Sequence, residues 1–129
     1  MLEAVLNRQI LRMLYERSSF KKAQLDSLLV KRHCDAHGIR FKNATVYKDK
    51  KTSLGSMARS ASQAEGVLSR SAASLILGLC LDLVPLSMVE AIPKVAGILK
   101  QPKTPDLSEE ELEQFLSLID AMLHQASHK

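Results

Sequence analysis

The chain has 129 residues and a formal net charge of +4, and it is 46% apolar, 25% charged and only 4% aromatic. These fractions argue against wholesale disorder, and the length suits a single domain, residues 1–129, with a real core. Two cysteines are too few for a disulfide scaffold. The start of the chain lacks the pattern of a signal peptide, and the longest uncharged apolar stretch, residues 71–81, is shorter than a bilayer span. We therefore expect a cytoplasmic protein without membrane contact.

The charge is divided unevenly along the chain. Residues 1–60 hold thirteen Lys or Arg against five Asp or Glu, whereas residues 61–129 hold five against nine. The basic residues are densest between 40 and 59, where Asp49 is the only acidic residue. Such a cluster favours a polyanionic partner, and we expect nucleic acid. An acidic protein partner, or a surface that only maintains solubility, are the alternatives. We accordingly divide the chain into a basic half, 1–64, and a helical core half, 65–129, which is also expected to mediate dimerisation.

Two amphipathic helices are predicted at the start of the chain. Residues 2–17 place their apolar side chains on one helical face. Ser18 and Ser19 make a short break, with Ser19 as the N-cap of a second helix over residues 20–36. Gly38 is expected to stop that helix in a left-handed conformation. The second helix is expected to bury Phe20, Leu25, Leu28 and Leu29.

Residues 39–48 predict a small basic β ribbon or an extended arm. Ile39 and Phe41 alternate with Arg40 and Lys42, and good strand formers follow from Thr45. Asp49 and the two lysines after it then give a polar break.

The longest predicted helix lies within residues 52–84, with a kink or break allowed at Gly66. Residues 74–83 are apolar on nearly every side, and we expect them to be the central buried element. Pro85 ends this segment, and Ser87 begins a fourth helix. Pro93 falls inside that helix and is expected to kink it or divide it into two short turns before Lys100. Residues 101–106 read as a linker.

The last predicted helix begins at a capping box formed by Ser108 and Glu111 and has a broad apolar face up to Ala126. We expect this face to pack on residues 75–83, to pair two copies of the chain in a homodimer, or both. The fold class predicted for the whole chain is mostly α, with about five helices, the small basic β ribbon or arm, and an N-terminal half of helix-turn-helix or winged-helix type.

The sequence does not indicate an enzyme. It contains no nucleophile elbow, phosphate-binding loop, dinucleotide fingerprint or zinc-protease motif. His33 and His37, like His124 and His128, are spaced for metal binding, but all four lie close to predicted helix C-termini, where positive charge is favourable. We predict no metal site and no cofactor.

Two placements of a DNA-recognition element compete. In the first, residues 2–36 form a helix-turn-helix and the ribbon is a wing. In the second, Thr52 and Ser53 cap a recognition helix whose short-chained polar face could approach a groove closely. The residues near the bases in the first placement are Ser18, Ser19, Lys21, Lys22 and Gln24, and its phosphate contacts are Lys31, Lys42, Lys48, Lys50 and Lys51. The second placement uses Ser56, Arg59 and Gln63. In both placements we expect the basic segment from Arg40 to Arg59 to lie at the interface.

We therefore expect a DNA-binding protein of helix-turn-helix or winged-helix type, a candidate transcriptional regulator, with duplex DNA favoured over RNA. The scarcity of aromatic residues argues against a platform for stacking single strands. The alternatives are a helical interaction subunit of a nucleoprotein assembly and an RNA-binding accessory factor.

Overall fold

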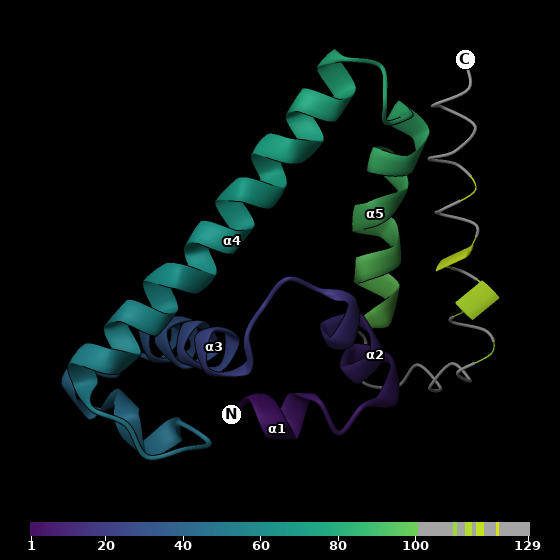
Figure 1. Ribbon diagram of the computed structural model, residues 1–129. Helices are drawn as coiled ribbons and strands as arrows, with labels where there is room; N and C mark the ends of the chain where they lie inside the picture. The colour runs from purple at the N-terminus through teal and green to yellow at the C-terminus, as the bar shows by residue number, and fades with distance from the viewer. Residues whose placement is uncertain (101–109, 111–112, 115, 118–120, 122–129) are drawn as a thin grey trace. The chain divides into compact units, whose positions relative to one another are not determined.

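The computed structural model describes residues 1–100, 110, 113–114, 116–117 and 121, and it is helical, with no strand among these residues (Figure 1). The mostly α fold class is therefore confirmed. The chain divides into two compact units, an N-terminal unit, Met1–Arg70, and a C-terminal unit, Ser71–Lys129. No helix within the described part of the chain is long and apolar enough to cross a membrane.

The first predicted helix is two helices in the structure, α1 (Leu2–Val5) and α2 (Gln9–Arg17). The carbonyl of Leu6, which would accept an N–H within a continuous helix, instead accepts a hydrogen bond from Arg12 Nε at 3.0 Å. The start of α1 is held by distant carboxylates, because the Leu2 N–H donates to Asp26 and the Glu3 N–H donates to Asp49, at 2.9 and 2.8 Å. The start of α1 is therefore capped by residues far along the chain, and the Leu6 carbonyl between the two helices has a side-chain donor.

Helix α3 (Lys22–Ala36) begins two residues later than predicted, and no side chain caps it. Ser18, rather than Ser19, stabilises the preceding turn: its Oγ donates to the Tyr15 carbonyl and accepts the Phe20 N–H. The predicted stop is confirmed, since Gly38 has φ +66° and the Ile39 N–H donates to the Cys34 carbonyl at 2.9 Å.

The buried face of α3 differs from the predicted one. Of the predicted core residues only Leu28 is fully buried, and Phe20, Leu25 and Leu29 are half-buried. The residues that α3 buries fully are Asp26, Ser27, Leu28, Val30 and Cys34. The face is rotated because Asp26 and Ser27 have polar partners inside the unit, which remove the penalty of burying them.

The predicted β ribbon is not found, because residues Phe41–Tyr47 form the 3-10 helix η1. Ala44 of η1 is fully buried in a core cluster with Val30, Cys34 and Met57. A strand here would have no partner strand among the described residues, so its backbone groups would gain nothing from an extended conformation. Packing against α3 and α4 therefore outweighs the strand preference of residues 45–47.

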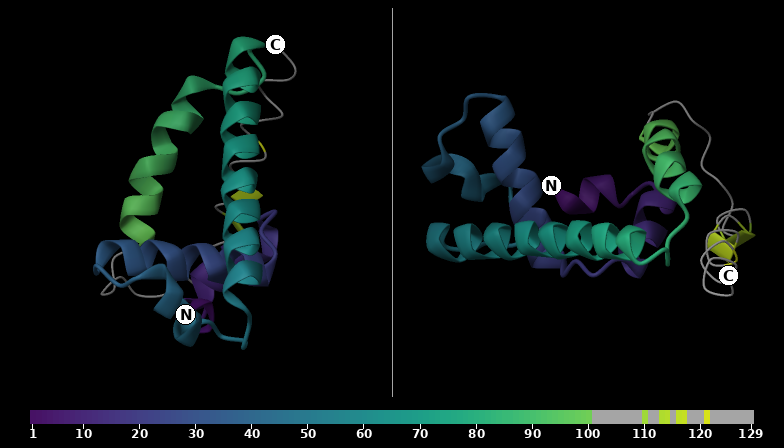
Figure 2. Two further views of the ribbon diagram at one scale, coloured as in Figure 1. Left: turned by 90° about the vertical axis from the view of Figure 1, so that its left-hand side faces the viewer. Right: turned by 90° about the horizontal axis from the view of Figure 1, so that it is seen from above.

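Helix α4 (Leu54–Cys80) includes Gly66 without a break, and both views of Figure 2 draw it as one continuous helix. Its predicted cap is confirmed, since Ser53 Oγ accepts the Ser56 N–H at 3.1 Å. In the N-terminal unit α4 buries Met57, Ala61, Ala64 and Val67.

The prediction that residues 74–83 form the central buried element is wrong. Leu75, Ile76, Leu77, Leu81 and Leu83 are all exposed, and Ile76 retains 62% of its accessible surface. The small buried residues that let α4 pack closely, Ala61 and Ala64, lie earlier in the helix. The apolar density of residues 74–83 therefore does not coincide with the packed face of α4.

The C-terminal end of α4 depends on two residues. Asp82 adopts a left-handed conformation with φ 57°, and the Leu83 N–H donates back to the Gly78 carbonyl at 2.8 Å. Helix α5 (Leu86–Leu99) then follows as one helix that contains Pro93, so the predicted division into two short turns is not found. The predicted helix over residues 108–126, and the homodimer expected through it, fall largely outside the described residues.

Replacing Asp82 by Gly is expected to raise the free energy of unfolding by up to about 1 kcal/mol, because glycine has no steric penalty at positive φ. Gly78→Ala should instead lower it by about 1 kcal/mol, because the new Cβ would lie 2.7 Å from Val84 Cγ2. Urea unfolding followed by circular dichroism measures both changes. A shift of the two variants in the same direction would contradict this account of the helix end.

Candidate nucleic-acid interface

A buried ion pair joins α3 to the segment that follows η1. The Asp26 side chain is 4% exposed and the Lys48 side chain 5%, and Lys48 Nζ lies 3.2 Å from Asp26 Oδ2. The same ammonium donates to Ser27 Oγ at 2.7 Å and to the Ala23 carbonyl at 3.0 Å. All three donors of Lys48 therefore have partners inside the protein.

Asp26 also binds backbone groups of two other segments, the start of α1 and the residue after Lys48. Its carboxylate accepts the Leu2 N–H at 2.9 Å and the Asp49 N–H at 3.0 Å, and it lies 3.3 Å from the ammonium of Met1. Burial alone would raise the pKa of Asp26, but the hydrogen bonds from Leu2, Asp49 and Lys48 outweigh it and lower the pKa below its ordinary value. Asp26 is therefore an ionised anchor for α1 and for residues 48–49.

The hydrogen bonds around Asp26 make one predicted phosphate contact, Lys48, unavailable to DNA. Lys48 is buried and fully hydrogen-bonded, so presenting it to a phosphate would leave Asp26 without its main cationic side-chain partner. The proposed interface leaves Lys48 out. Its role is to fix the path of the chain from η1 into Lys50 and Lys51, which are both exposed.

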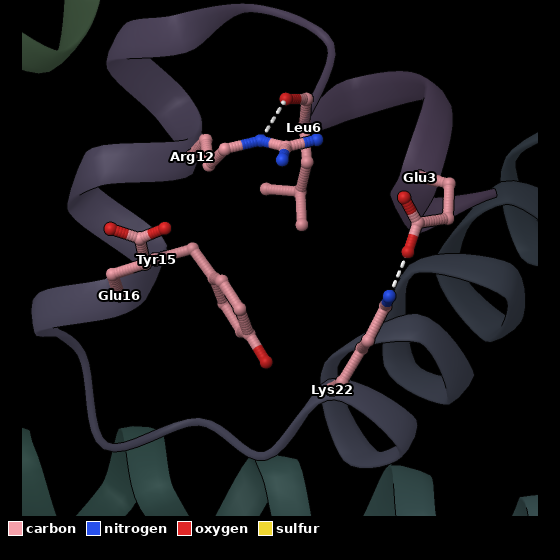
Figure 3. Close-up of a pocket in the computed structure, with 6 residues that line it drawn as sticks. All are labelled: Glu3, Leu6, Arg12, Tyr15, Glu16 and Lys22. Atoms are coloured by element: carbon pink, nitrogen blue, oxygen red, sulfur yellow. Dashed lines mark hydrogen bonds and ion pairs between the residues drawn. The ribbon is translucent and has the colours of Figure 1, made fainter.

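Lys22, a residue of the first recognition placement, is also engaged within the protein. It forms an ion pair with Glu3 and lines a hollow of about 120 Å³ between α1, α2 and the start of α3 (Figure 3). The figure shows the Lys22 side chain directed toward Glu3, with Glu16 and Arg12 on the other side of the hollow. Acidic and basic groups are balanced there, so the hollow is unsuited to a polyanion. Lys21 is exposed at the N-cap of α3.

Helices α3 and α4 are linked by side chains on both sides of their contact. Gln24 Nε2 donates to Gln63 Oε1 at 2.9 Å, and Lys31 Nζ donates to Glu65 Oε1 at 2.9 Å. The hydrogen bond from Lys31 lowers the pKa of Glu65. Because residues 63 and 65 flank the buried Ala64, the two links fix the rotation of α4 about its own axis. The structure thus brings together one residue from each predicted recognition placement, Gln24 and Gln63.

The remaining predicted cations are exposed and lie on consecutive elements. Arg40 and Lys42 are at the start of η1, Lys50 and Lys51 lie between η1 and α4, and Arg59 is in the second turn of α4. Within the described residues none of these five side chains has an ion pair or a hydrogen bond. Ser56, which the second recognition placement also uses, is half-buried in the first turn of α4. The ends of η1 and α4 that carry these cations are packed together through Ala44 and Met57.

The predicted histidine pair on α3 forms a ring contact. The centroids of His33 and His37 are 4.3 Å apart, and His37 Nδ1 lies 2.9 Å from the His33 carbonyl. Tyr47 of η1 lies beside His33, with ring centroids 5.3 Å apart. No group of three or more metal-ligating side chains is found in the part of the chain that the structure describes.

Sequence reasoning missed Asp26 as a structural residue. One signal was present: Asp26 is four residues before Val30 and eight before Cys34, so the three share a helical face. An acidic residue on an apolar face implies a buried cationic partner. The sequence offers many lysines for that role and does not indicate which one is used.

The chain was compared with known proteins, and no family model, no curated protein and no solved structure matches it.

Proposed function

We propose that the chain binds duplex DNA, with Arg40, Lys42, Lys50 and Lys51 contacting phosphates. The observation that carries this proposal is the run of exposed cations on η1, the following segment and the start of α4, none of which is neutralised by an acidic side chain of the described residues. Unneutralised cations held on packed elements bind a phosphate backbone with release of its counterions. The role that fits such binding is transcription regulation by a cytoplasmic, dimeric protein.

The proposal keeps the helix-turn-helix class and omits the wing, because residues 41–47 form η1. Duplex DNA is favoured over single strands, since binding of single strands relies on exposed aromatic side chains. Phe20 and Phe41 are half-buried, and Tyr47 is 37% exposed and packs beside His33. No cluster of exposed aromatic rings is thus present among the described residues of the basic unit.

The test is a titration of the purified protein with a mixed-sequence DNA duplex over a series of salt concentrations. Four phosphate contacts predict a slope of about −4 for log K against log salt. Parallel titrations with a single strand and with an RNA duplex are expected to give weaker binding. Failure to bind any DNA duplex at low salt would contradict the proposal.

One observation favours the alternative of a helical interaction subunit in a nucleoprotein assembly. Five large apolar side chains between residues 75 and 83 are exposed, and such exposed apolar groups are typical of a surface that binds another protein. In that case the basic segment would lie against DNA or RNA that other subunits already hold. The lone protein would then bind duplexes weakly, and its affinity would increase when the assembly's other subunits are added.

A further inference from the structure

We propose that the first three turns of α4 are the base-reading helix of the DNA complex, with Arg59 and Gln63 contacting neighbouring purines in the major groove. This inference rests on the proposed function and assigns the reading role to α4 rather than to α3. It follows from the pattern of side chains on α4, from the contact between Gln24 and Gln63, and from the position of the exposed cations.

Polar side chains form one stripe on the first turns of α4. The stripe has the spacing i, i+3, i+4 and i+7, which places its members on one side of a helix, and it consists of Ser56, Arg59, Ser60 and Gln63. The stripe lies beside the face that buries Met57 and Ala61, and its two long side chains, Arg59 and Gln63, are exposed. The helix can therefore pack on α3 and still leave the Arg59 and Gln63 side chains accessible to DNA.

Apart from Leu54 at the start of α4, the rest of the exposed surface of these turns is made of short side chains. Gly55, Ala58 and Ser62 are all exposed and lie next to the stripe. An α-helix with its side chains is about 10–12 Å across, and the major groove is about 12 Å wide. Short neighbours therefore let the helix axis approach the base edges, so that only the two long residues reach them.

Gln24 fixes the orientation of the Gln63 amide. Gln24 Nε2 donates to Gln63 Oε1 at 2.9 Å, which uses one of the two lone pairs of that oxygen. The Gln63 NH₂ group and the second lone pair have no partner among the described residues. A donor beside an acceptor matches N7 and the N6 amino group of adenine. Gln24 is therefore a positioning residue, and Gln63 is the group that contacts the base.

Arg59 supplies a second reading contact at a defined distance. Its guanidinium suits the O6 and N7 acceptors of guanine, which it can bind with two hydrogen bonds. Arg59 and Gln63 are separated by four residues, or about 6 Å along the helix axis. Since base pairs are about 3.4 Å apart, the two side chains reach pairs that are one or two steps apart. The expected site thus contains a guanine and an adenine within two base pairs.

The test is selection of bound duplexes from a random-sequence DNA library by the full chain at physiological salt, followed by sequencing. The wild type is expected to enrich duplexes that contain a guanine and an adenine within two base pairs of each other. Arg59→Ala should reduce the guanine preference roughly 5- to 150-fold, and Gln63→Ala should reduce the adenine preference by a similar factor. Gln24→Ala should weaken the adenine preference more than the guanine preference, because Gln24 orients the Gln63 amide and has no hydrogen bond to Arg59.

Lys50→Gln is the matched control, because loss of a phosphate contact weakens binding to all sequences alike. Binding with a steep salt dependence but without enrichment would overturn the inference and leave the proposed function standing. Enrichment that survives both Arg59→Ala and Gln63→Ala would also overturn it. An RNA duplex has a major groove too narrow for a helix, so an equal preference in RNA would contradict groove reading. Absence of any duplex binding would contradict the proposed function itself.

Discussion

Replacing Asp26 by Asn is expected to lower the free energy of unfolding of the N-terminal unit by about 3 kcal/mol. The Asp26 carboxylate lies 3.2 Å from Lys48 Nζ and 3.3 Å from the Met1 ammonium, and it accepts two backbone N–H groups. An amide of the same shape would leave the buried Lys48 ammonium without a counter-charge and would turn an NH₂ group toward one of these donors. Urea unfolding followed by circular dichroism measures the loss.

The same substitution is expected to change the pH dependence of stability. The pKa of Asp26 is lowered in the folded protein, so its ionisation contributes stability that is fully present above the unfolded-state pKa of about 4. This contribution is lost as the pH falls through the lower pKa of the folded state. The wild type should therefore lose stability below about pH 4, and Asp26→Asn should lack this part of the acid dependence.

Asp35→Asn is the matched control, because it makes the same chemical change on the same helix at an exposed position. An effect within about 0.5 kcal/mol is expected there. Equal effects of the two substitutions would show that the Asp26 network does not stabilise the unit. Lys48→Met should destabilise about as much as Asp26→Asn, and the effects of the two substitutions should not add, because each breaks the same ion pair.

The sequence predicted the helices best where local signals act alone. The stop at Gly38 and the cap at Ser53 both depend on residues within a few positions of each other. Each is confirmed, because capping and turn geometry are decided by the residues that make them. Periodicity likewise predicted a mostly helical chain.

Predictions failed where a distant partner decides the outcome. The helix expected over residues 2–17 is divided into α1 and α2, and the start of α1 is bound by the carboxylates of Asp26 and Asp49, which have no signal near residues 2–17. The ribbon expected at residues 39–48 is η1 because Ala44 packs against α3 and α4. Local strand preference spans only about 1 kcal/mol, which burial of a few side chains exceeds.

The candidate interface shows the same division between local and distant effects. The charge pattern indicated residues 40–59 as a basic segment, and the structure leaves Arg40, Lys42 and Lys50 exposed. The charge pattern could not distinguish Lys48 from Lys50, because both are lysines in one basic segment and only tertiary packing places Lys48 beside Asp26. The hydrogen bond between Gln24 and Gln63 joins residues 39 positions apart and has no local signal at all.

Neutralising the proposed phosphate contacts is expected to have the largest effect on binding. The variant that replaces Arg40, Lys42, Lys50 and Lys51 by Gln should bind duplex DNA on the order of 10³-fold more weakly at physiological salt, and its slope of log K against log salt should move toward zero by about 4. These side chains have no ion pair or hydrogen bond within the described residues. Their loss should therefore leave the unfolding midpoint in urea nearly unchanged.

A pair of double variants separates a local interface from an effect of total charge. Lys50→Gln with Lys51→Gln removes two charges from the proposed interface and should shift the salt slope by about 2. Lys94→Gln with Lys100→Gln removes the same charge from exposed positions on and just after α5, outside the N-terminal unit, and should leave the slope unchanged. If the two double variants changed the salt slope equally, DNA binding would depend only on the net charge of the protein. Because phosphate contacts act at short range under physiological screening, a defined interface requires the two variants to differ.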